Sequence, residues 1–248
     1  DFAGGAVVHI NAGAAALAVI MVLGNRRSWP REAMPPHNLP FTMLGTGILW
    51  FGWFGFNAGS ALAANGLAAQ ALVNTHLAAA AAMLSWLGIE KLRTGHFTTL
   101  GAASGAVAGL VAITPCAGFV GGVAPIIIGL AAGVVCFLAL RLKLRFKLDD
   151  SLDVIAVHLV GGILGSVLLG LFADTKVNSL GFDGLFSGGG SKLLVNQVIA
   201  VVATFAFSFV VTYVVARILN ATMGIRVSPE DELAGLDQSQ HAEAAYQA

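Results

Sequence analysis

Two histidines stand out because each lies deep inside an apolar segment. His9 lies in "DFAGGAVVHINAG" and His158 in "DSLDVIAVHLVGG". Both segments follow the pattern Asp-x7-His-x3-Gly, so that Asp1 matches Asp150. A neutral imidazole offers one hydrogen-bond donor and one acceptor, so it can hold a small polar molecule or pass on a proton where charged groups are excluded.

The composition is that of a membrane protein. Of the 248 residues 57% are hydrophobic and only 10% are charged, whereas about 25% are charged in a typical soluble domain. A bilayer core requires roughly 20 apolar residues of helix. Seven stretches are predicted to span it, and these are 2–23, 41–64, 68–89, 97–113, 120–142, 152–172 and 193–218.

The basic residues predict an orientation for these spans. Cytoplasmic loops of membrane proteins are enriched in Lys and Arg. Eleven of the thirteen basic residues fall on one side, and only Lys176 and Lys192 fall on the other. The Asp1 end is therefore predicted to lie outside a cytoplasmic (inner) membrane, and the C-terminal tail inside the cell.

This topology makes the two histidine segments run in opposite directions, which predicts an inverted repeat. Eight helical residues place each histidine about 12 Å below its aspartate, from opposite leaflets. The imidazoles are then expected to meet near the midplane. The alternative is two unrelated buried histidines, each bonded to a backbone carbonyl; we favour the pair because polar groups at this depth are costly and usually face a pathway.

The second predicted span carries an unusual group of aromatic residues in "LWFGWFGFNAGSALAANG". Helical spacing places Phe56 and Ser60 on one face, with Trp53 beside them. Aromatic ring faces bind cations, and a hydroxyl adds a hydrogen-bonding group. The segment therefore indicates a constriction that holds a cation, the alternative being an aromatic belt at the membrane interface.

Other kinds of chemistry find little support. The net charge is zero, which gives no indication of nucleic-acid binding. Cys116 and Cys136 lie in or beside apolar segments and are expected to be small buried residues rather than a disulfide or metal site. No metal or other cofactor is predicted. The chain begins without Met, inside a hydrophobic segment, so we expect it to be the C-terminal part of a longer protein.

Several segments, taken in order, resemble the ammonium transporter (Amt/Mep/Rh) family, specifically its bacterial Amt branch. They are "DFAGGAVVHINAG", "WFGWFGFNAGSA", "VNTHLAAAAAML", "AGLVAITPCAGFV", "DDSLDVIAVHLVGG" and the tail "GIRVSPEDELAGLDQSQHAEAAY". The resemblance implies an all-α membrane fold of eleven transmembrane helices, two inverted halves of five and a last helix. This chain would supply seven of them, helices five to eleven, in a homotrimer with one pore per subunit.

The resemblance also implies roles for individual residues. His9 and His158 correspond to the twin histidines of the pore. Asp150 corresponds to the inner repeat partner of the outer aspartate. The site of ammonium recruitment and the outer gate would use Asp1, Trp53, Phe56 and Ser60. The other gate phenylalanine belongs to the helices that precede this chain.

The function implied is ammonium transport: the ion is recruited at an outer aromatic vestibule and deprotonated, and ammonia passes along an apolar pore. The protein is not expected to be an enzyme. An ammonium sensor acting through a partner and a Rh-type gas channel remain alternatives. A proton-pumping respiratory subunit is disfavoured, because no Lys or Glu lies inside the predicted spans.

The chain is expected to divide into a transmembrane region, 1–219, and a cytoplasmic regulatory tail, 220–248. Ser228, Pro229 and Asp231 have the pattern of a helix N-terminus, and "GLDQSQHAEAAY" is expected to form a second short helix. The resemblance implies that this tail docks a PII-type signal protein, the alternative being a frayed, solubilising end.

Overall fold

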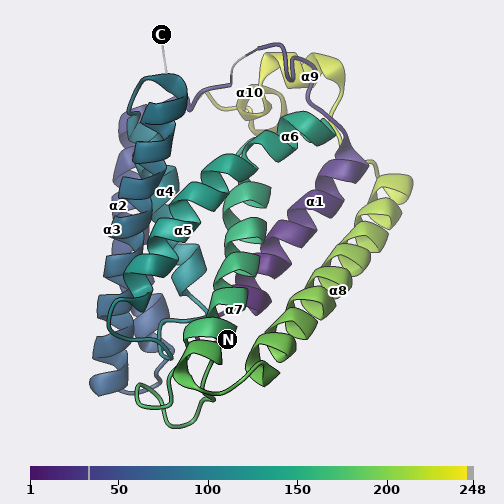
Figure 1. Cartoon of the computed structure of the whole chain (residues 1–248). Coiled ribbons are helices and arrows are strands. Elements are labelled where there is room, and N and C mark those ends of the chain that lie inside the picture. Colours follow the sequence, from purple (N-terminus) through teal and green to yellow (C-terminus); the bar gives the residue numbers. More distant parts are fainter. Residues whose placement is uncertain (33, 245–248) are drawn as a thin grey trace.

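A computed structural model describes residues 1–32 and 34–244, and every regular element in them is a helix (Figure 1). Two π-helices, η1 and η2, run directly into the α-helices that follow them. The elements are η1 (Gly5–Ile10), α1 (Asn11–Leu23), α2 (Leu39–Gly59), α3 (Gly66–Thr94), α4 (Thr99–Ile113), α5 (Ala124–Ala139), α6 (Arg141–Phe146), η2 (Ile155–Val160), α7 (Gly161–Phe172), η3 (Leu185–Ser187), α8 (Lys192–Thr222), α9 (Pro229–Ala234) and α10 (Leu236–His241).

Six helical segments in the described residues are long and apolar enough to cross a membrane. They are η1 with α1, α2, α3, α5 with α6, η2 with α7, and α8. The fourth predicted span forms α4, an apolar helix of only 15 residues. The second span ends five residues earlier than predicted, at Gly59, because the chain turns there before Asn65 starts α3.

Short polar side chains begin several of the helices. The Asn38 side chain accepts a hydrogen bond from the Phe41 amide at the start of α2, and Asn65 and Thr98 make the corresponding bonds at α3 and α4. Such caps satisfy amides that the first helical turn leaves without partners. Ser228 caps α9 in the way its sequence predicts.

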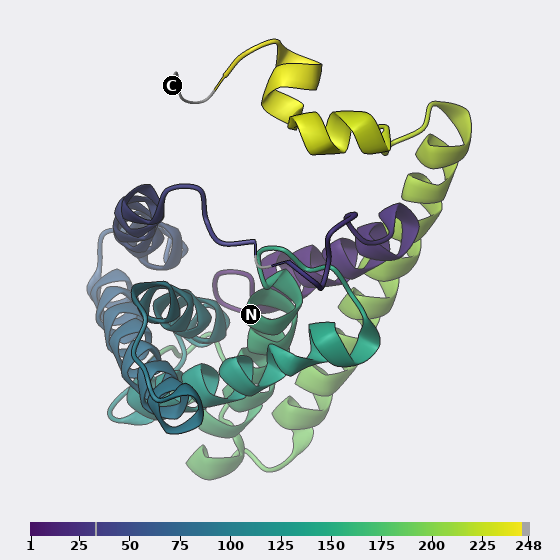
Figure 2. The same cartoon turned by 90° about the horizontal axis from the view of Figure 1, so that it is seen from above.

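The helices pack in two groups that meet at α7. Helix α3 packs closely against α4 and α5, and its buried Ala78 and Ala82 allow the backbones to approach. Helix α1 packs along α8, and α7 contacts α4, α5 and α8 (Figures 1 and 2). The cysteines at 116 and 136 are buried, as expected.

Segments η1–α1 and η2–α7 contact each other and run in opposite directions (Figure 1). The glycines that follow the two histidines lie at this crossing. A Cβ atom at Gly13 would lie 2.5 Å from the Leu159 Cβ, and one at Gly162 would lie 2.9 Å from the Gly5 carbonyl oxygen. Only residues without a side chain permit this approach, which brings the two histidine-bearing turns together.

The tail helices α9 and α10 lie at the end of the molecule that also holds the connections after α1, α3 and α6 (Figure 1). The Glu232 carboxylate accepts hydrogen bonds from the Arg27 amide and the Arg226 guanidinium, each at 2.8 Å. Arg226 also donates to the Leu23 carbonyl at 2.8 Å. The start of the tail is therefore attached to the end of α1.

We predict that Gly13→Ala destabilises the full-length protein by about 1–3 kcal/mol, because the added methyl overpacks a crossing where backbone atoms cannot move aside. Gly88→Ala is the matched control, since a Cβ there meets nothing within 4 Å and alanine favours the helix. Thermal unfolding of the purified protein in detergent measures both. Equal midpoints for the two variants would contradict the packing argument.

Candidate functional site

The structure brings His9 and His158 into direct contact. Their Nδ1 atoms lie 3.2 Å apart, and their ring centroids lie 5.3 Å apart. Two Nδ1 atoms at this distance share one hydrogen, so one ring donates and the other accepts. His9 is 2% exposed, and its Nε2 is buried with no partner among the described residues. The pair therefore leaves a buried imidazole nitrogen available to a ligand.

Both histidines lie on π-helical turns rather than in the α-helix that the sequence predicts. A π-helix bonds i to i+5 and accommodates an extra residue in the turn, and such turns are frequent at functional sites. Here each π-helix ends at the start of an α-helix, at Asn11 and at Gly161. The apolar periodicity contains no signal for this change.

The two matched aspartates begin these turns. Asp1 accepts hydrogen bonds from the four backbone amides of residues 4–7, and Asp150 accepts from the amides of Val154 and Ile155. A carboxylate is stabilising at a helix N-terminus, where amides are free and the helix dipole is positive. Because both Asp1 oxygens bond to the backbone, the geometry gives Asp1 the task of holding η1 in place.

Aromatic rings cover one side of the pair. Trp53 stacks on His9 with ring centroids 5.2 Å apart and planes 16° from parallel. Phe56 meets His9 edge-on at 6.4 Å and Trp53 at 5.7 Å. Trp53 is buried, whereas Phe56 is 37% exposed. Three of the predicted residues thus form one cluster with His158.

Ser60 lies at the end of α2, one turn beyond Phe56. Its hydroxyl donates to the Phe56 carbonyl oxygen at 2.8 Å. Because that hydrogen is used within the helix, the Ser60 oxygen has only lone pairs to offer, and it can accept a hydrogen bond from a cation that carries N–H groups. The spacing argument placed Phe56 and Ser60 on one face, and this bond agrees with it.

Sequence reasoning missed the polar group behind Trp53. The indole Nε1 donates to the Thr114 hydroxyl at 3.0 Å, and Thr114 is fully buried. Thr114 lies at the C-terminal end of α4, 61 residues from Trp53. The sequence around Thr114 contains no pattern that would connect this threonine with a tryptophan 61 residues away.

A partly buried ion pair fixes the loop that precedes η2. Arg26 donates to Asp149 through its backbone amide at 2.8 Å and through its guanidinium Nε and Nη2 at 2.8 and 2.7 Å. The Asp149 side chain is only 3% exposed. These hydrogen bonds from Arg26 lower the pKa of the Asp149 carboxyl. Because Asp150 is the next residue, the ion pair also holds the segment that caps η2.

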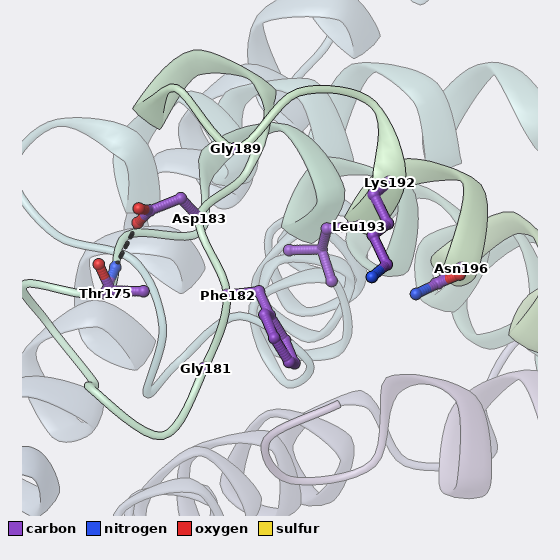
Figure 3. A pocket seen from close by; sticks show the side chains of 8 residues that line it. All are labelled: Thr175, Gly181, Phe182, Asp183, Gly189, Lys192, Leu193 and Asn196. Carbon is purple, nitrogen blue, oxygen red and sulfur yellow. Dashed lines mark hydrogen bonds between the residues drawn. The ribbon is translucent and has the colours of Figure 1, made fainter.

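A separate hollow of about 270 Å³ lies among the loop after α7 and the first turns of α8 (Figure 3). Phe182 and Leu193 contribute apolar side chains to its lining, and Lys192 and Asn196 line it from α8. The Thr175 amide donates to Asp183 at 2.7 Å, a bond that lowers the pKa of this partly exposed carboxyl. None of its eight lining residues belongs to the histidine cluster.

Comparison with known proteins decides the family. Residues 1–246 match the model of the Ammonium Transporter Family. The ammonium transporter of Mycobacterium tuberculosis strain H37Rv is 51% identical over 251 residues. The chain belongs to the ammonium transporter family. It is accordingly a multi-pass membrane protein.

Other members show how much of the family architecture the chain covers. Amt1 of Archaeoglobus fulgidus is 50% identical over 246 residues. These alignments cover 99% of this chain but only 53% of the mycobacterial protein and 62% of Amt1. The chain thus spans between half and two thirds of the length of these relatives.

Solved structures give the same picture. The crystal structure of Candida albicans Mep2 matches with a TM-score of 0.86 and 38% identity, over 93% of this chain and 53% of that one. A structure titled "Sensor Amt Protein" also matches at 0.86, with 33% identity over 97% of this chain and 60% of that one. The all-helical arrangement is therefore that of Amt and Mep proteins.

We predict that the Arg26–Asp149 pair loses its contribution to stability in acid. A carboxyl whose pKa is lowered in the folded state contributes stability above its unfolded pKa, about 3.9 for Asp, and loses it as the pH falls through the folded value. Arg26→Gln should therefore lower the unfolding midpoint at pH 7, and the difference from wild type should shrink below about pH 4.

The matched control is Arg31→Gln, which changes an exposed arginine in the same loop. It should leave the midpoint near that of wild type at every pH. Thermal unfolding between pH 3 and pH 8 compares the proteins. A difference for Arg26→Gln that persists undiminished at pH 3 would show that the ion pair is not its cause.

Proposed function

We propose that the full-length protein to which this chain belongs transports ammonium across the cytoplasmic membrane. One observation carries the proposal: the buried His9 is hydrogen-bonded to the partly buried His158, and its Nε2 has no partner among the described residues while Trp53 and Phe56 lie against its ring. Two relatives of about 50% identity are named ammonium transporters. The geometry by itself suits a small polar molecule. Membership of the family indicates that this molecule is ammonium or ammonia.

The proposed mechanism separates ammonium from potassium, which has the same charge and a similar size, by deprotonation. A cation that enters an apolar pore bears a large desolvation cost, whereas neutral ammonia bears little. Aromatic faces and the Ser60 oxygen hold the ion at the mouth. The dry pore then admits ammonia and rejects potassium, which has no proton to lose.

In this proposal His9 and His158 line the pore. Their shared hydrogen bond requires that only one of the two Nδ1 atoms carries a hydrogen, so the outer nitrogens of the neutral pair offer ammonia one donor and one acceptor. The same bond offers a route for a proton between the rings. Asp1 and Asp150 act indirectly, because each binds backbone amides at the start of the π-helix that carries a histidine.

The wider architecture follows the family. We propose that α4 is a seventh membrane span, that η1–α1 and η2–α7 are corresponding parts of an inverted repeat, and that the protein is a homotrimer. The Asp1 end would lie outside and the tail in the cytoplasm. Support comes from the basic residues, the opposite directions of the two segments and the caps that Asp1 and Asp150 make in common.

We propose that residues 1–219 form the transport region and 220–248 a regulatory tail that docks a PII-type signal protein. Helix α9 has three acidic residues in its first turn, and Leu233 and Leu236 are exposed. Exposed apolar side chains beside charges are typical of a docking surface. Residues 245 and 246, the last two of the predicted second helix, lie outside the described residues.

An ammonium sensor is a second candidate function. The match to the structure titled "Sensor Amt Protein" favours it. The same histidine cluster would then bind ammonium without carrying it through, and a partner would receive the signal. Flux distinguishes the two, because a sensor binds its ligand without net uptake.

We predict that the full-length protein in proteoliposomes takes up radiolabelled methylammonium while excluding potassium. His9→Asp should admit potassium, because it replaces an imidazole with an acceptor that can be charged and so eases the entry of cations and water. Uptake no greater than that of empty vesicles would refute transport. Potassium exclusion that survives His9→Asp would refute the selective role of the pair.

We predict that deleting the residues after Gly224 abolishes co-purification of a PII-type protein. The deletion removes the acidic turn and the exposed leucines of α9 and α10. A gentler variant, Leu236→Ser, should weaken the interaction without detaching the Glu232 anchor from α1. Retention of the signal protein by the deleted variant would show that the tail is not its docking site.

A further inference from the structure

A polar cluster is buried between α2, α3 and α4, directly behind the ring that stacks on His9. We call Trp53, Thr114, Asn57 and Thr75 the Thr114 cluster. Thr114, Asn57 and Thr75 are each 0% exposed, and Trp53 is 6% exposed. Burying a polar side chain costs folding free energy unless the side chain forms a hydrogen bond. In this cluster each of them has a partner.

The direction of these bonds is fixed by the Thr114 hydroxyl. Its single hydrogen points to the Leu110 carbonyl oxygen at 2.7 Å, much closer than the Asn57 Oδ1 at 3.4 Å. Because that hydrogen is used, the Thr114 oxygen can only accept from the indole Nε1 of Trp53 at 3.0 Å. Thr114, which is 61 residues away in the chain, thus holds the indole N–H in one direction.

The other two members, Asn57 and Thr75, hold α2 against α3. The Asn57 Nδ2 donates to the Thr75 hydroxyl at 2.9 Å, and Thr75 donates to the Ala71 carbonyl at 2.6 Å. The Thr114 carbonyl accepts from the Ala3 amide at 3.2 Å, close to the aspartate that caps η1. Thr114 therefore joins α4 both to the tryptophan and to the segment that leads into the first histidine turn.

We infer that Thr114 is a positioning residue for ammonium recruitment: its hydroxyl holds the Trp53 ring against His9 and beside Phe56, and thereby sets the affinity for the ion. The inference rests on the proposed function. Cation–π attraction depends on where the ring face lies. When the hydroxyl is removed, the indole N–H is left buried without a partner, and the ring turns away to find one. The histidine pair itself keeps its own bond.

The test is methylammonium uptake by the full-length protein with Thr114→Val, which keeps the shape and removes the hydroxyl, and Thr114→Ser, which keeps the hydroxyl. Thr114→Val should raise KM roughly five- to tenfold, the effect of one lost buried hydrogen bond, with the saturated rate per folded molecule within about twofold of wild type. Thr114→Ser should restore a KM within about twofold of wild type.

Thr46→Val is the matched control. Among the described residues, the Thr46 hydroxyl bonds only the Thr42 carbonyl of its own helix, at 2.8 Å. Thr46 lies seven residues before Trp53 on α2. Its KM should equal that of wild type. Thr75→Val, at the far end of the Thr114 cluster, should shift KM in the same direction as Thr114→Val but less. In a Trp53→Phe background Thr114→Val should add no further change.

Indole fluorescence provides a readout that does not require transport. Thr114→Val should shift the emission spectrum, and the shift should vanish in the Trp53→Phe background. An unchanged KM and spectrum for Thr114→Val, or an equal KM increase with Thr114→Ser, would overturn the inference. Absence of wild-type uptake would overturn the proposed function, and the spectra would then still decide whether Thr114 holds Trp53.

Discussion

One hydrogen bond between two imidazoles organises the centre of this molecule. The His9 and His158 Nδ1 atoms lie 3.2 Å apart. A bond of this kind forms only if both rings reach the same point from different segments, and each feature around them contributes to that. Gly13 and Gly162 allow the segments to cross, and Asp1 and Asp150 fix the start of each π-helical turn.

The sequence predicted which residues approach one another better than it predicted the hydrogen bonds that hold them there. Charge, hydropathy and the matched Asp-x7-His-x3-Gly segments were enough to bring His9 and His158 together. Helical spacing placed Phe56 and Ser60 on one face. The contact between His9 and His158 confirms that the two histidines meet. The spacing of Phe56 and Ser60 could be predicted because helix periodicity is a local rule, which a single segment expresses by itself.

The features that the sequence did not predict depend on contacts between distant segments. The π-helical turns leave no periodic signal, since one extra residue in a turn changes no composition. Thr114 belongs to an apolar helix end, and only the folded chain shows that its hydroxyl faces Trp53. The early end of α2 at Gly59 likewise depends on a turn between α2 and α3 that hydropathy does not resolve.

The adjacent residues Asp149 and Asp150 illustrate how function and stability are divided. Asp149 pairs with Arg26 and holds the loop, whereas Asp150 accepts amides and starts η2. Both are carboxylates, and their different tasks come from the partners that the fold supplies. The site thus depends on polar groups in the loops as well as on its own residues.

The most direct measurement of the central bond is nuclear magnetic resonance of ¹⁵N-histidine in the full-length protein in lipid bilayers. A hydrogen shared between the two Nδ1 atoms couples the spins of both nitrogens, with one Nδ1 protonated and the other not. The account predicts a ¹⁵N–¹⁵N coupling that disappears in His9→Ala and in His158→Ala. Two uncoupled nitrogens in the wild-type protein would contradict it.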